Sequence, residues 1–130
     1  MPHLDTYLEH NLRPLARCLD IAEQYGLELA IETIPCISSD PLSNVRRACK
    51  HDARSRIALD SEFLAIHDQL DDVFAASWLW QTGLVRYVHL KDYDGTPFSE
   101  GGRRYVHLGE GQIDLGASCV NCESLVSIAV

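Results

Sequence analysis

Three polar side chains close to the ends of short apolar runs are of the types that bind a divalent metal ion. Glu32 ends the run LELAIE, Asp60 ends RIALD, and His89 lies within VRYVHLKD. These residues are 28 and then 29 positions apart, which is about the length of one βα unit. Two carboxylates and a neutral imidazole that converge at one point suit Mn²⁺, Co²⁺, Mg²⁺ or Zn²⁺.

Parallel strands would bring these side chains together. The runs at residues 28–32, 56–60 and 85–89 are rich in β-forming residues and are followed by loop or helix signals. We therefore expect three adjacent parallel strands in sequence order, with helices covering one face of the sheet. Consecutive parallel strands end at the same edge, so the three polar side chains should meet there.

Helical patterns precede each of these runs. Apolar residues at three- and four-residue steps predict a first helix that ends near Tyr25, with a kink or a break into two helices at Pro14. The pair Asp40-Pro41 predicts the start of a second helix through about Lys50. Residues 70–82 predict a third helix, whose two tryptophans are packing residues.

The region after His89 is dense in turn residues. It contains a short β-like run at 103–108, which we expect to belong to a lid or binding loop. Lys91 and Asp92 are expected to pair with each other or with neighbouring strand ends. The tail at 112–130 has weak periodicity and one possible short strand at 125–128.

Length and charge set further limits. A chain of 130 residues with 46% hydrophobic content is expected to form one domain, residues 1–130, around a real core. A complete (β/α)₈ barrel needs roughly 200 residues or more, so this chain supplies about half of one. The net charge of −8 argues against nucleic acid as a partner. Neither a signal sequence nor a membrane span is visible, so we expect a cytoplasmic protein without a membrane partner.

Four segments, in this order, carry a family resemblance: LARCLDIAEQYGLELAIET, RIALD, VRYVHLKDYDG and VHLGEGQID. Together they resemble the C-terminal half of the xylose-isomerase-like TIM barrels, over roughly residues 5–115. That superfamily includes sugar and sugar-phosphate isomerases and epimerases, inosose dehydratases and apurinic endonucleases. The resemblance implies an α/β fold, here a partial (half) TIM barrel of consecutive parallel βα units, truncated relative to a full barrel and with an atypical tail at 112–130.

The resemblance also assigns the metal site and its reaction. It implies that Glu32, Asp60 and His89 bind the metal, and that Glu32 also acts as a catalytic acid and base. The implied substrate is a small sugar or sugar phosphate. The implied reaction is proton transfer next to a carbonyl through an enediolate, with a metal bound to adjacent substrate oxygens.

Further positions follow from the same resemblance as substrate-binding candidates. Glu110 matches a turn that often shapes the rim of the active site, and His107 is expected to line that rim. Members of the family often carry a histidine where this chain has Phe63, so His67 would have to replace that imidazole.

One departure from the family leaves the function open. The family's last strand ends in a glutamate that completes the metal site and acts as the second base, and Ala129 would occupy that position here. The first alternative is therefore a non-catalytic half-barrel that self-associates through open sheet edges. A metal-dependent phosphodiesterase of the apurinic endonuclease type is disfavoured by the negative charge. We expect a homo-oligomer whether the chain is an isomerase or epimerase or a non-catalytic half-barrel.

Overall fold

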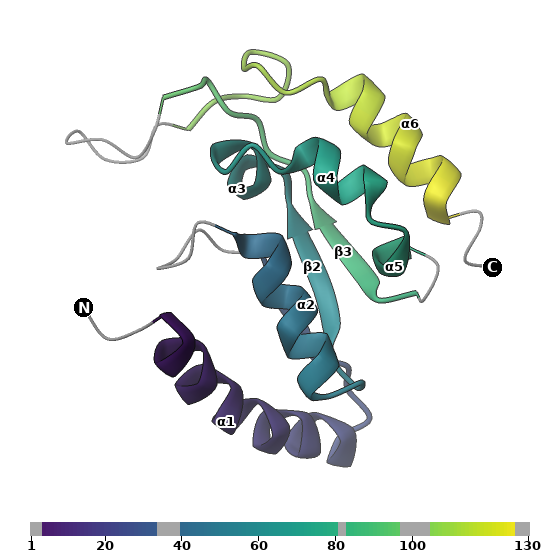
Figure 1. Cartoon of the computed structure of the whole chain (residues 1–130). Helices are drawn as coiled ribbons and strands as arrows, with labels where there is room; N and C mark the ends of the chain where they lie inside the picture. Colours follow the sequence, from purple (N-terminus) through teal and green to yellow (C-terminus); the bar gives the residue numbers. More distant parts are fainter. Residues whose placement is uncertain (1–3, 34–39, 81–82, 97–104, 127–130) are drawn as a thin grey trace.

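The computed structural model describes residues 4–33, 40–80, 83–96 and 105–126 (Figure 1). Within them lies a small open sheet of parallel strands in the order β1-β2-β3. The strands are β1 (Ala30–Glu32), β2 (Arg56–Asp60) and β3 (Val85–His89). The predicted α/β class, parallel direction and strand order are confirmed, although β1 begins two residues later than predicted.

The register of the strands decides which side chains share a face. Glu32 pairs with Ala58, and Asp60 pairs with His89. Ala58 and Asp60 are two residues apart on β2, so all of these side chains lie on one face of the sheet. A register shift follows Ile57, because that residue pairs with Val85 while the next residue of β2 pairs with Tyr87. The shift is a β-bulge that leaves one extra residue in β3.

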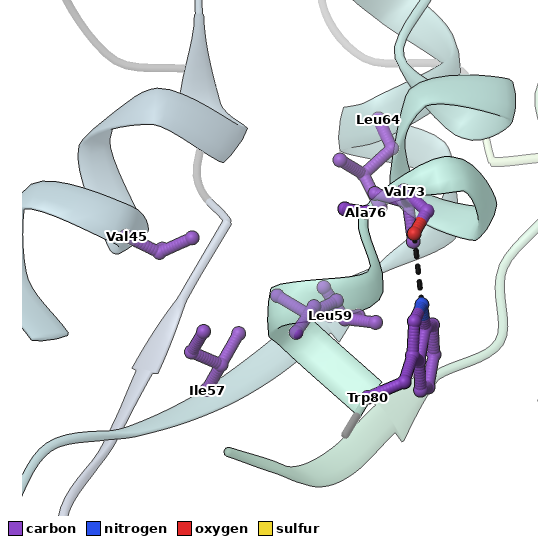
Figure 2. Close-up of a cluster of buried hydrophobic side chains, with 8 residues drawn as sticks. Val45, Ile57, Leu59, Leu64, Val73, Ala76 and Trp80 are labelled. Carbon is purple, nitrogen blue, oxygen red and sulfur yellow. Dashed lines mark hydrogen bonds between the residues drawn. The ribbon is translucent and has the colours of Figure 1, made fainter. Parts of the chain in front are cut away.

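The opposite face of the sheet carries the main core, which Figure 2 shows in close-up. Ile57 and Leu59 of β2 point into it and are 0% and 3% exposed. Four helices cover them: α2 (Pro41–His51), α3 (Ser61–Ile66), α4 (Leu70–Ala75) and α5 (Ser77–Trp80). The core cluster consists of Val45, Ile57, Leu59, Leu64, Val73, Ala76, Leu79 and Trp80. Burial of a side chain of this size contributes about 2 kcal/mol, so this cluster holds the helices on the sheet.

A second, smaller cluster joins α1 (Leu4–Gln24) to α2. Leu15 and Leu19 of α1 pack with Ala48 of α2. The helix is continuous through Pro14, so of the two alternatives predicted there, a kink or a break into two helices, the break is wrong. Pro14 is exposed, which lets water satisfy the backbone carbonyl that its missing N–H leaves unpaired.

Helix ends follow the predicted signals. After α1, Gly26 adopts a positive φ of 65°, and the N–H of Leu27 returns to the carbonyl of Ala22, as in a Schellman ending. Before α2, the carboxylate of Asp40 accepts the N–H of Ser43 at 2.8 Å. Both predicted boundaries are confirmed within a residue.

The region after β2 differs from the prediction. The expected single helix at 70–82 is wrong, because α4 and α5 are separate short helices with a break at Ala76. The tryptophans do pack: Trp80 is 4% exposed, and its ring nitrogen donates to the Val73 carbonyl at 2.8 Å (Figure 2). Helix α3 was not predicted, because six residues are too few for a clear periodic pattern.

The tail also differs from the prediction. Residues 115–126 form helix α6 (Leu115–Val126), so the described part of the expected strand at 125–128 is helical and that prediction is wrong. Its hydrophobic and polar residues are poorly separated, which explains the weak periodicity. Residues 105–108 form no strand, which corrects the described part of the β-like run. Ala129 lies outside the described residues. None of the described helices is long and apolar enough to cross a membrane.

Candidate metal centre

Glu32, Asp60 and His89 meet at the C-terminal edge of the sheet, as predicted. Each residue offers one ligand atom, and these atoms all lie within 4.8 Å of one another. The three residues are the last of β1, β2 and β3, so the parallel sheet itself brings them together. This group of donors could hold a metal ion.

Glu32 and His89 contact each other directly. The Nδ1 atom of His89 lies 2.7 Å from Oε1 of Glu32, and 3.9 Å from Oδ2 of Asp60. An ionised carboxylate only accepts hydrogen bonds, so a contact with ionised Glu32 makes Nδ1 the donor and leaves Nε2 of a neutral imidazole as the nitrogen with a lone pair. A carboxylate that fixes the tautomer of an imidazole in this way is common around metal-binding histidines.

Asp60 is the buried member of the group, with 0% exposure. Its backbone N–H donates to Oγ1 of Thr33 at 2.9 Å, which ties the ends of β1 and β2 together. Its Oδ1 atom accepts the N–H of Phe63 at 3.2 Å and caps the first turn of α3. Only Oδ2 therefore faces the other charged side chains.

Lys91 lies beside this group, and its ammonium donates to Oδ2 of Asp60. The same ammonium lies 4.7 Å from the centre of the Phe63 ring. Ser61 fixes the backbone of Lys91 from both sides, because Oγ accepts its N–H at 2.7 Å and donates to its carbonyl at 2.6 Å. Of the two pairings expected for Lys91, the pairing with a neighbouring strand end is therefore the one observed.

Asp92 has a different role, at the base of the long loop that follows β3. Its carboxylate is 3% exposed and accepts four backbone N–H groups at 2.8 to 3.2 Å. The donors are Tyr93, Gly109, Gly111 and Ile113. Burial disfavours the charged form of Asp92, but the four N–H bonds outweigh it and hold the pKa below the ordinary value of 3.8. Asp92 therefore fastens residues 109–113 to the end of β3.

The three residues predicted to bind substrate are not part of the donor group. His107 is exposed and lines a cavity of about 220 Å³ together with Lys91, Asp92 and Glu62. His67 follows the C-terminus of α3, and its Nε2 is buried without a hydrogen-bond partner among the described residues. Glu110 is exposed on the turn, where its N–H donates to the His107 carbonyl at 3.0 Å. The substrate roles of these three residues remain predictions. His107 shares its cavity with Lys91, the residue that contacts Asp60.

The donor set fits a divalent ion, with one complication. Two carboxylates, an imidazole nitrogen and open positions suit oxygen- and nitrogen-preferring ions such as Mn²⁺ or Mg²⁺. The complication is Lys91, whose ammonium already neutralises one negative charge of the group. The sequence analysis expected only a structural role for this lysine. Its signal in the sequence was its position two residues after His89, the spacing at which side chains of an extended chain point to the same side.

Comparison of the chain with protein-family models, curated proteins and solved structures finds no match.

Proposed function

We propose that this chain is a divalent-metal-dependent sugar or sugar-phosphate isomerase or epimerase, built on part of a xylose-isomerase-like barrel. The observation that carries the proposal is the convergence of Glu32, Asp60 and His89, with donor atoms within 4.8 Å at the C-terminal edge of a parallel sheet. Active sites of α/β proteins lie at this edge. The resemblance of the ordered motifs to that superfamily is the reason for proposing this reaction class.

The residues divide the chemistry among them. A bound Mn²⁺, Co²⁺, Mg²⁺ or Zn²⁺ would polarise substrate oxygens and make a neighbouring carbon-bound proton more acidic. Asp60 and His89 would hold the ion. Asp60 is buried, and its bond from the Phe63 N–H at the start of α3 keeps its carboxylate in place. Glu32 is the group that moves the proton, because its side chain is 28% exposed and can reach a substrate.

Self-association is a second candidate function, favoured by the uneven covering of the sheet. The helices of the main core pack on one face, whereas Tyr87 on the other face is 62% exposed. A second copy that covers this face would form a homo-oligomer and would exclude water from the site. Light scattering at micromolar concentrations should then give a mass above 14.6 kDa. A monomer at all concentrations would contradict this candidate.

Calorimetric titration with Mn²⁺ tests the metal site. We expect the parent chain to bind Mn²⁺ and Asp60→Ala to lose binding, because the substitution removes the buried carboxylate. His51→Ala is the matched control, since His51 is an exposed residue at the end of α2, and it should bind as the parent does. Identical isotherms for Asp60→Ala and the parent would contradict the assignment.

Proton exchange in D₂O tests the reaction. A panel of ketoses, aldoses and their phosphates is incubated with the chain and Mn²⁺, and deuterium incorporation next to the carbonyl is followed by NMR. We expect at least one substrate to exchange, and Glu32→Gln to abolish the exchange. If Glu32→Gln exchanged as fast as the parent at saturating Mn²⁺, Glu32 would not be the group that moves the proton.

A further inference from the structure

We infer that Lys91 is a built-in competitor of the metal ion, which holds the coordinating oxygen of Asp60 until a divalent cation displaces it. This inference rests on the proposed metal site and concerns its regulation. Lys91 would then set the concentration of divalent cation that is needed to fill the site.

The competition arises because one oxygen of Asp60, Oδ2, faces the other charged side chains. Oδ1 is used by the N–H of Phe63, and losing that bond would uncap α3. Oδ2 is the atom that the Lys91 ammonium contacts, and it is the Asp60 oxygen that lies on the side of His89, 3.9 Å from Nδ1. A metal ion that binds Asp60 on the side of His89 would therefore use the oxygen that Lys91 holds.

Several contacts hold the Lys91 ammonium beside Oδ2 of Asp60. Ser61 bonds both its backbone N–H and its carbonyl, which fixes the start of the side chain. The ring of Phe63 lies 4.7 Å from the ammonium, a distance at which the face of an aromatic ring attracts a cation. That ring also gives the ammonium a place to remain close by after it leaves Oδ2.

The charges of the group define the consequence of the competition. Two carboxylates and one ammonium carry a net charge of −1, with His89 neutral. A divalent ion would bring the group to +1 if Lys91 stayed in place. Two cations within about 4 Å repel each other even in water, so the ion and the ammonium cannot both be held tightly by one oxygen.

Calorimetric titration with Mn²⁺ tests the inference on Lys91→Met. We expect binding about 10-fold tighter or more than in the parent, since removal of the competing cation leaves Oδ2 open. Lys91→Gln is the second variant, because its amide can still donate to buried Asp60 and so protects the fold. Lys50→Met is the matched control, since Lys50 is an exposed lysine on α2 and its loss gives the same change in net charge.

The outcomes separate the inference from the proposed function. Tighter binding in both Lys91 variants and unchanged binding in Lys50→Met support the competition. Equal or weaker binding in the Lys91 variants overturns it, while the metal site stands if Asp60→Ala still abolishes binding. If neither the parent nor any Lys91 variant binds Mn²⁺, the metal site itself is wrong.

A spectroscopic readout tests the displacement directly. The ammonium of an ion-paired lysine gives a ¹H–¹⁵N signal that differs from that of a hydrated lysine. We expect diamagnetic Mg²⁺ to shift this signal of Lys91 in the parent, and Asp60→Asn to remove its dependence on Mg²⁺. A signal that stays unchanged at a Mg²⁺ concentration that saturates the site would overturn the inference.

Discussion

Asp60 and Asp92 are both buried carboxylates near the ends of neighbouring strands, but their partners differ in kind. Asp92 accepts four backbone N–H groups, all from its own loop. Asp60 gives one oxygen to a backbone N–H and the other to the side chain of Lys91. Backbone donors are fixed by the fold, whereas a side-chain ammonium can leave.

These partners distinguish an anchoring carboxylate from one that can bind a ligand. A carboxylate has about four lone-pair positions, and at Asp92 four are used by the chain itself. At Asp60 the outward oxygen has only side-chain partners, so a cation can replace one of them. Substitutions at Asp92 should therefore change stability, and substitutions at Asp60 should change binding.

The largest expected effect is on stability, in Asp92→Ala. The substitution leaves four N–H groups without their acceptor, and we expect the free energy of unfolding to fall by about 3 kcal/mol or more. Urea denaturation followed by circular dichroism measures the loss. Asp114→Ala is the control. Within the described residues, the exposed side chain of Asp114 accepts one N–H, that of Ala117, so this substitution should cost about 1 kcal/mol. Equal losses in the two variants would contradict the anchoring role.

Gly111→Ala should have the next largest effect. A Cβ atom at this position would lie 2.5 Å from Cγ of Asp92 and 2.6 Å from the Tyr93 carbonyl oxygen, and neither atom can move freely. We expect a loss of about 2 kcal/mol in the free energy of unfolding. Gly116→Ala, on α6, is the control and should lose no stability, since its Cβ would meet only Oδ1 of Asp114 at 3.4 Å.

Asp60→Asn should affect stability less than either of these changes. The amide oxygen can still cap α3 through Phe63, so only the contact with Lys91 is lost, at a cost of about 1 kcal/mol. Mn²⁺ binding should nevertheless disappear, because a neutral amide is a poor metal ligand beside a lysine. A loss of stability as large as that of Asp92→Ala would mean that Asp60 is an anchor too.

The smallest effect expected is a dependence on pH. The pKa of Asp92 is lower in the folded chain than its ordinary value of 3.8, so ionised Asp92 stabilises the fold above that pH. This contribution is lost as pH falls through the lowered pKa. The stability difference between the parent and Asp92→Asn should therefore shrink below about pH 4. A difference that stays constant down to pH 2 would show that ionisation is not involved.

The donor group could be predicted from the sequence because the patterns that indicate each strand are local. Each strand is a short apolar run, and the regular length of the βα units places Glu32, Asp60 and His89 at one edge. The four donors to Asp92 could not be predicted in this way, because three of them lie 17 to 21 residues away, beyond a long loop. Helix α6 was missed because its residues do not separate into an apolar and a polar side.

Because of the β-bulge after Ile57 and Val85, β3 could lose one residue without changing the pairing of Asp60 with His89. The bulge absorbs one residue, so Asp60 is opposite His89 although β3 is one residue longer than β2 over the paired stretch. Deletion of Arg86 alone would leave the same pairs in place and would remove its exposed ion pair with Glu28 and its hydrogen bond to the Gly83 carbonyl. A one-residue insertion elsewhere in β3 would instead turn His89 towards the core. A scan of single-codon deletions and insertions through β3 should therefore find one tolerated deletion, at residue 86, in a strand that otherwise accepts none.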